Sequence, residues 1–338
     1  RGGKRMKRAQ AEASVGEPVK DNHYIRAGLK DVMRGKTMGN IKRHWMLYLF
    51  LLPSVTLVGI FCYGSMFGIF IAFQEYELLG GVLGSEFVGL KNFIDIFTAD
   101  TLGTYRYFRN TIYISLIRIG TNFPIILIYT LLVNEIKRRR IKSVVQTISF
   151  LPHFISWVVV GGLAYNLLTV NGGTLNRILE IFGQEEIFWY SEPKYWWGIL
   201  AVSSLWKGMG WATIMYLSAL GSIDGELYDA CLIDGGGRFR QAISVTLPGI
   251  MNVVVLQIIL DMGGIMGDNY DQIISMINGS QSLSETTEVV GVLTFNAATG
   301  SGNLSRATAF GLIQSVIGFM LVLISNRVAK KAGQTGIV

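Results

Sequence analysis

The first long apolar run of the chain, residues 45–73, reads WMLYLFLLPSVTLVGIFCYGSMFGIFIAF. None of its 29 residues is Lys, Arg, Asp or Glu. As an α-helix the run would extend roughly 43 Å at about 1.5 Å per residue, whereas the hydrocarbon core of a bilayer is about 30 Å thick. The run therefore predicts one tilted helix that crosses a membrane.

Five further segments have the same character, with at most two charged side chains each: 107–133, 143–169, 195–223, 247–267 and 309–326. Any one of them alone could be a buried helix of a soluble protein. Six in one chain of 338 residues, of which 50% are apolar and only 16% charged, make that alternative improbable. The sequence predicts an all-α, polytopic membrane protein with six transmembrane helices.

The basic residues indicate how the chain is oriented. The N-terminal segment and the loops on its side of the predicted membrane hold 22 of the 30 Lys and Arg residues, and the opposite loops hold five. Cytoplasmic loops carry the excess of positive charge, so both termini are predicted to be cytoplasmic. Because the net charge of +7 arises next to the membrane, it does not indicate nucleic-acid binding. The predicted organisation is a basic cytoplasmic segment (1–44), a first helix with its outer loop (45–106), a core (107–331) and a cytoplasmic tail (332–338).

The loop between the fourth and fifth predicted helices differs from a plain connector. Residues 225–248 read GELYDACLIDGGGRFRQAISVTLP. The pattern predicts a short helix, a break at three consecutive glycines and a second short helix that leads back into the membrane. Gly235 is expected to adopt a positive φ at the break. A glycine-rich connector without a role is the alternative from composition alone.

The same loop resembles the EAA motif of ABC-importer permeases, E-A-A, three residues, G, nine residues, I, one residue, L-P. The matching positions are Asp229-Ala230-Cys231, Gly235 and Val245-Thr246-Leu247-Pro248, at the same spacing. Asp229, Cys231 and Val245 are conservative departures, and Gly236 stands where the family commonly has Ala. Further stretches resemble the polysaccharide-type carbohydrate permeases: 84–93, Asn110-Thr111, 146–157 and 223–228.

The resemblance implies a type I ABC-importer permease fold in the bacterial cytoplasmic membrane. It implies that the loop is a coupling helix that docks on a separate ATPase, with these residues: Glu226, Tyr228, Asp229, Ala230, Cys231, Asp234, Gly235, Leu247 and Pro248. The expected partners are a second homologous permease subunit, a dimer of ATP-binding subunits, an extracytoplasmic sugar-binding protein and membrane lipid. The chain has no G-x-x-x-x-G-K-[ST] phosphate loop, so we expect no enzymatic activity and no cofactor in it, with ATP and Mg bound by the ATPase.

Two ionisable residues lie deep within predicted spans, Lys207 and Asp261. They could form a buried ion pair, or they could line a polar path with nearby aromatic side chains that suit sugar rings. By resemblance to maltose-type importers, the sugar contacts fall at Ser204, Lys207, Gly208, Trp211, Asp261, Asp268 and Tyr270. Lys207 could attract a carboxylated sugar, whereas a neighbouring Asp261 would neutralise it.

The leading hypothesis is therefore the translocation subunit of an ATP-driven importer of oligosaccharides derived from polysaccharides, including acidic uronate oligomers. A secondary transporter is the first alternative, but it would show internal repeats, and none is visible between residues 45–169 and 195–331. An ABC permease for a non-sugar solute also remains open. A membrane enzyme would need acid, base or nucleophile groups gathered at one depth, and no such set stands out.

Overall fold

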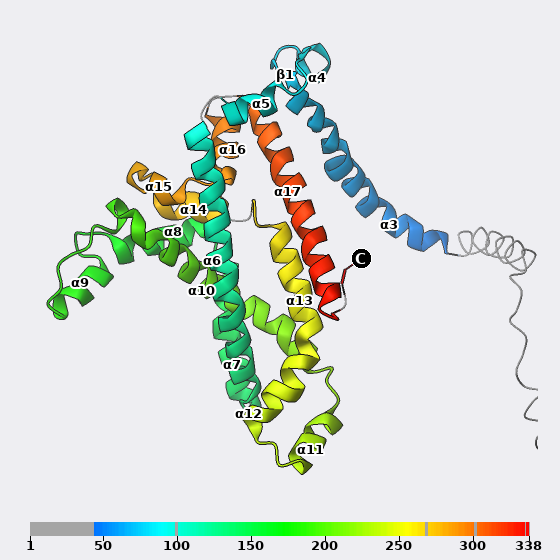
Figure 1. The fold of residues 1–338 in the computed structure, drawn as a ribbon, viewed down its shortest axis with the longest axis vertical. Coiled ribbons are helices and arrows are strands. Elements are labelled where there is room, and N and C mark those ends of the chain that lie inside the picture. The colour runs from blue at the N-terminus through cyan, green and yellow to red at the C-terminus, as the bar shows by residue number, and fades with distance from the viewer. Residues whose placement is uncertain (1–43, 99–100, 268–269, 301–302, 335, 338) are drawn as a thin grey trace, which may run out of the picture. The chain divides into compact units, whose positions relative to one another are not determined.

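The computed structural model describes residues 44–98, 101–267, 270–300, 303–334 and 336–337 (Figure 1). The chain divides into two units, Arg1–Phe67 and Gly68–Val338, and each is treated by itself. This division falls within the first predicted membrane helix. The predicted segment 1–44 lies almost entirely outside the described residues, and the predicted domain boundaries stay predictions.

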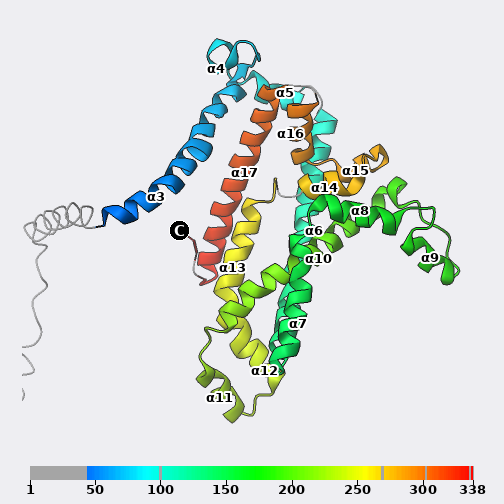
Figure 2. The same ribbon diagram turned by 180° about the vertical axis from the view of Figure 1, so that it is seen from behind.

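The second unit is built around four long helices: α6 (Thr101–Asn134), α10 (Trp196–Leu220), α13 (Leu247–Gly263) and α17 (Leu304–Lys331). α10 packs between α6 and α13, and α17 packs on α13, as Figures 1 and 2 show from two sides. Glycines permit close contacts, because a Cβ on Gly318 would lie 2.6 Å from the Gly263 carbonyl oxygen. The mostly helical fold predicted from the sequence is confirmed.

Shorter elements complete the second unit. They include the antiparallel pair β1 (Gln74–Glu75) and β2 (Glu86–Phe87), then α4 (Gly81–Gly84), α5 (Lys91–Thr98), α9 (Thr174–Ile181), η4 (Trp189–Ser191), η5 (Pro193–Tyr195), α14 (Tyr270–Ile277), η7 (Gln281–Leu283), α15 (Ser284–Thr287) and α16 (Val290–Thr299). The buried Asn110 amide donates to the carbonyl oxygens of Glu285 and Glu288, 2.9 and 3.0 Å away. These bonds attach the segment around α15 to α6.

The segment predicted as one helix over 143–169 is bent. α7 (Arg139–Phe150) continues into η3 (Leu151–Phe154), and α8 (Trp157–Leu168) then leaves at 99°. Pro152 lacks the N–H that would continue the helix, Ile155 is extended, and the Ser156 hydroxyl caps α8 by accepting from the Val159 N–H. The prediction of one helix over 143–169 is therefore wrong, because the apolar composition does not report a break in the backbone.

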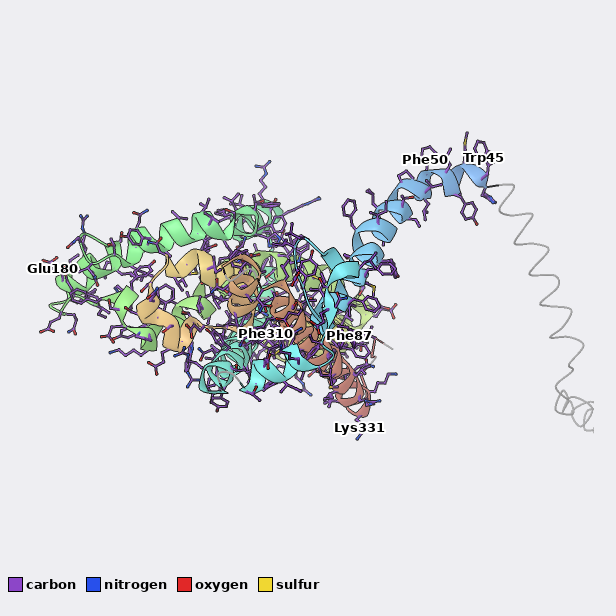
Figure 3. All side chains as sticks on the ribbon, turned by 90° about the horizontal axis from the view of Figure 1, so that it is seen from above. Trp45, Phe50, Phe87, Glu180, Phe310 and Lys331 are labelled. Carbon is purple, nitrogen blue, oxygen red and sulfur yellow. The ribbon has the colours of Figure 1, made fainter. Side chains whose placement is uncertain are left out.

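In the first unit, α3 (Trp45–Val58) is followed by the π-helical turn η1 (Gly59–Tyr63) and the start of η2 (Gly64–Phe73). No residue of α3 is buried, and Figure 3 shows Trp45 and Phe50 projecting from the helix. The exposed fraction of Phe50 is 78%. A helix that is apolar on all sides is stable in lipid rather than in water.

Four helices within the described residues are long and apolar enough to cross a membrane, or five if the bent pair counts as one span. They are Trp45–Phe73, Gly103–Asn134, Arg238–Gly263 and Leu304–Lys331. α10 has a sufficient length of 25 residues, but Lys207 and the polar residues near it lower its hydropathy. Six spans and cytoplasmic termini therefore remain predictions.

Candidate functional site

The loop between α10 and α13 forms the two short helices expected from its sequence. α11 (Gly225–Ile233) begins at Asp224, whose carboxylate accepts from the Glu226 N–H at 3.0 Å. It ends in a glycine turn in which Gly235 has a φ of +76° and the Gly236 N–H donates to the Cys231 carbonyl oxygen at 2.8 Å. The positive φ predicted for Gly235 is confirmed.

After the turn the chain forms one helical stretch, Arg238–Gly263. It comprises α12 (Arg238–Gln241), the π-helical turn η6 (Ala242–Thr246) and α13. Leu247 and Pro248 begin α13. The wider turn lies directly before Pro248, where the missing proline N–H would otherwise interrupt the hydrogen-bond ladder. The second short helix of the loop is thus continuous with the following span.

Three contacts attach the loop to its surroundings. The Tyr228 hydroxyl lies 3.1 Å from the Thr246 hydroxyl, and the Gln241 amide donates to the Tyr228 carbonyl oxygen at 3.5 Å. Arg238 forms an ion pair of 2.7 Å with Glu135, directly after α6. These contacts fix the base of the loop and leave its outer side uncovered.

The outer side of the loop is apolar as well as charged. Leu227, Leu232, Ile233 and Phe239 are exposed by 54, 58, 86 and 80%. Glu226, Asp229, Ala230 and Asp234 are exposed beside them, whereas Tyr228 and Cys231 are half-buried. Figures 1 and 2 place α11 and α12 together at the end of the second unit that is remote from α16. Exposed apolar residues on a loop that is fixed at its base are typical of a protein interface.

A polar cavity of about 200 Å³ lies between α6, α10 and α13. It is lined by Arg118, Ile119, Asn122, Phe123, Ile126, Ser204, Gly208, Ala212, Tyr216, Gln257, Ile258 and Asp261. The Asn122 amide donates to the Ser204 hydroxyl at 3.3 Å, and the Gln257 amide donates to the Asp261 carboxylate at 3.0 Å. The Asn122 side-chain oxygen is buried without a hydrogen-bond partner. A polar ligand with hydroxyl donors would supply that partner.

The cavity brings together three of the residues predicted for a substrate path, Ser204, Gly208 and Asp261. Sequence reasoning missed Arg118, Asn122, Tyr216 and Gln257. A signal was present, because Arg118 and Asn122 are four residues apart, as are Gln257 and Asp261, and such pairs share one face of a helix.

The other predicted path residues lie elsewhere. Trp211 stacks on His153 and Phe150, with ring centroids 4.7 and 5.8 Å apart. Tyr270 packs on Phe295 at a centroid distance of 4.9 Å. Asp268 lies outside the described residues.

Lys207 binds the backbone at the bend between η3 and α8. Its ammonium group donates to the carbonyl oxygens of His153 at 2.8 Å, Ile155 and Pro152, and it lies 5.5 Å from the Trp157 ring centroid. The hypothesis of a Lys207–Asp261 ion pair is therefore wrong for this structure. Lys207 contacts the bend, whereas Asp261 lines the polar cavity, and the sequence could not show this because it does not fix the rotation of one helix against another.

The chain is similar in sequence to a protein family and to several known proteins. A family model described as "binding-protein-dependent transport system inner membrane component" matches residues 120–332. The polygalacturonan/rhamnogalacturonan transport system permease protein YteP of Bacillus subtilis is 35% identical over 98% of this chain and 100% of its own. Protein LplB of the same organism is 34% identical over 89% of this chain and 93% of its own.

Among solved structures, a chain of a bacterial alginate ABC transporter in complex with an alginate pentasaccharide-bound periplasmic protein is similar. It aligns with a TM-score of 0.79 and 29% identity, covering 88% of this chain and 99% of that chain.

We predict that Lys207→Met lowers the stability of the purified protein in detergent by about 1–3 kcal/mol, because the carbonyl groups at the bend lose a charged donor. The midpoint of thermal unfolding measures the change. Asp261→Asn in the Lys207→Met background should restore nothing. Recovery of the midpoint in the double variant would show that the two residues interact after all.

A second prediction concerns Gly236, where an added Cβ would lie 2.5 Å from the Cys231 Sγ. Gly236→Ala should destabilise the α11 turn by about 1–3 kcal/mol through overpacking. Cys231→Ala should recover only part of the loss, because the Cys231 carbonyl oxygen, 2.7 Å from the added Cβ, stays in place. Gly237→Ala is the matched control, since nothing lies within 4 Å of a Cβ there. Thermal unfolding of the four proteins gives the coupling energy. Equal effects of Gly236→Ala with and without Cys231 would refute the contact.

Proposed function

Because this chain belongs to the family of binding-protein-dependent transport system inner membrane components, we propose that it forms the translocation path of an ATP-driven importer for oligosaccharides derived from acidic polysaccharides. The family supports transport over enzymatic activity and an ABC importer over a secondary transporter. The relatives support the substrate class, since one is named for polygalacturonan and rhamnogalacturonan and a similar structure for the acidic polysaccharide alginate. The proposed location is the bacterial cytoplasmic membrane.

The observation that carries the proposal is the exposed α11 with its positive-φ turn. In this assignment α11 docks on an ATPase subunit through Leu227, Leu232 and Ile233, which nothing covers in the described structure. Glu226, Asp229, Ala230 and Asp234 flank the contact, and Cys231, Gly235, Leu247 and Pro248 set its geometry. ATP and Mg act in the partner. A second permease subunit and an extracytoplasmic sugar-binding protein complete the assembly.

The helical stretch Arg238–Gly263 connects docking to transport. Gln257 and Asp261 lie on the same continuous stretch as the loop. Gln257 is 19 positions after Arg238, a span of roughly 28 Å at about 1.5 Å per residue. Movement of the loop by the ATPase therefore displaces one wall of the polar cavity. The walls formed by α6 and α10 contribute Asn122 and Ser204, whose amide and hydroxyl groups suit sugar hydroxyls.

The substrate assignment predicts the response of the purified complex in proteoliposomes. Binding protein loaded with uronate oligosaccharides should stimulate ATP hydrolysis, and binding protein mixed with neutral maltooligosaccharides should leave the basal rate unchanged. Measured rates of phosphate release distinguish the two cases. Stimulation by the neutral sugars alone would reject the acidic substrate class and leave the importer assignment intact.

Coupling is tested at Gly235. Leu at φ +76° costs of order 1 kcal/mol or more and turns α11 away from its docking position. Gly235→Leu should lower stimulated ATP hydrolysis and transport by at least about tenfold. A strain of about 1.4 kcal/mol in the docked state produces a tenfold loss of docking. Membrane insertion should survive. Gly237→Leu, at a φ of −73°, is the control. Full stimulation in Gly235→Leu would contradict the assigned role of α11.

A further inference from the structure

Four consecutive cations stand between α6 and the first turn of α7: Lys137, Arg138, Arg139 and Arg140, hereafter the elbow cluster. All four side chains are exposed. They form no hydrogen bond or ion pair with other residues that the structure describes. The nearest carboxylate in the sequence, Glu135, pairs with Arg238 at 2.7 Å. The positive charge of the cluster is therefore not neutralised by the described part of this chain.

The elbow cluster does not stabilise α7. Arg138 occupies the N-cap without a side-chain capping bond, and the first turn contains no acidic residue. Cations at the N-terminal end of a helix oppose its dipole, and each costs a few tenths of a kcal/mol. Packing does not explain the cluster either, because its side chains are exposed. The cluster is therefore available to an anionic partner outside the described chain.

An apolar stripe continues directly from the elbow cluster along α7 and η3. Ile141, Val144, Ile148 and Leu151 are exposed by 46, 55, 66 and 63%. Their spacing of three and four residues places them on one face. The neighbouring face packs on α10, where a Cβ on Gly210 would lie 2.1 Å from the Ser149 carbonyl oxygen. The free face of this helix is thus cationic at its start and apolar for the next three turns.

We propose that the elbow cluster and the apolar stripe together bind an anionic phospholipid of the cytoplasmic leaflet. The headgroup phosphate contacts the guanidinium groups of Arg138, Arg139 and Arg140, and the acyl chains lie along Ile141, Val144 and Ile148. Arginine presents a planar fork of donors that matches phosphate oxygens. A free phosphate would use only the cations, whereas a phospholipid uses both features.

The lipid site lies next to the helix and the loop that are proposed to act in transport. The elbow cluster follows α6, which carries Arg118 and Asn122 of the polar cavity, and the adjacent Glu135 holds Arg238 of the coupling loop. A lipid bound there sits at the junction of cavity wall and coupling loop.

Native mass spectrometry of the purified full-length chain with its partner subunits tests the proposal, with phosphatidylglycerol and phosphatidylcholine as probes. The protein should bind phosphatidylglycerol more tightly. Each cation near an anionic surface contributes about fivefold in affinity, so the triple variant Arg138→Gln, Arg139→Gln, Arg140→Gln should weaken phosphatidylglycerol binding by on the order of a hundredfold. Binding of phosphatidylcholine should not change.

Two controls isolate the site. The triple variant Lys91→Gln, Arg177→Gln, Lys194→Gln removes the same charge from exposed positions elsewhere and should retain phosphatidylglycerol binding. Ile148→Asn should weaken both lipids, because it interrupts only the apolar stripe.

Three results would overturn the proposal. The first is equal affinity for the two lipids, and the second is unchanged phosphatidylglycerol binding in the elbow-cluster variant. The third is competition by free glycerol phosphate at the same concentration as the lipid, which would leave the stripe without a role. Loss of the ATPase subunit from the elbow-cluster variant, with lipid binding intact, would assign the cations to a protein contact instead.

Discussion

A helix break leaves backbone carbonyl groups without their helical donors, and away from water each of them needs a donor from the protein. The bend between η3 and α8 meets this requirement with the Lys207 ammonium group, which reaches the carbonyl oxygens of Pro152, His153 and Ile155. The Ser156 hydroxyl meets the corresponding need at the start of α8. Because Lys207 belongs to α10, the same contact holds α10 against the bend. A charge that looked like part of a substrate site in the sequence is thus a structural element, and the arrangement of α7, α8 and α10 depends on it.

The polar cavity and the loop between α10 and α13 are joined by covalent continuity rather than by a chain of side-chain contacts. The stretch from Arg238 to Gly263 begins in the loop and ends beside the cavity, and Pro248 is accommodated by the wider turn before it. Glu135 attaches the same loop to the end of α6, which forms another wall of the cavity. All three helices around the cavity therefore meet the loop, since α10 leads into it, α13 continues from it and α6 contacts it through Glu135.

Most of the long helices could be predicted from the sequence because a helix that crosses a membrane needs about 20 mostly apolar residues. Runs with at most one charged side chain located α3, α13 and α17 well, and the glycine triplet predicted the α11 turn together with the φ of Gly235. The bend at Pro152 and the position of Lys207 could not be predicted, since both depend on how helices rotate and approach each other. The spacing of Arg118 and Asn122, and of Gln257 and Asp261, indicates a shared helix face within each pair, but it does not show that the two pairs meet. Only the packing of α6, α10 and α13 shows that they meet.

The π-helical turn Ala242–Thr246 changes the direction in which side chains before and after it point around the helix axis. A turn of this type accommodates one residue more than an α-helical turn, and each residue of an α-helix rotates the chain by about 100°. The number of residues between them therefore sets the angle around the helix axis between the exposed face of the loop and the cavity face at Gln257 and Asp261. Removing or adding one residue in this stretch would turn one face by about a quarter of a revolution relative to the other, with every remaining side chain unchanged. The number of residues in this segment therefore sets how the exposed loop faces relative to the cavity.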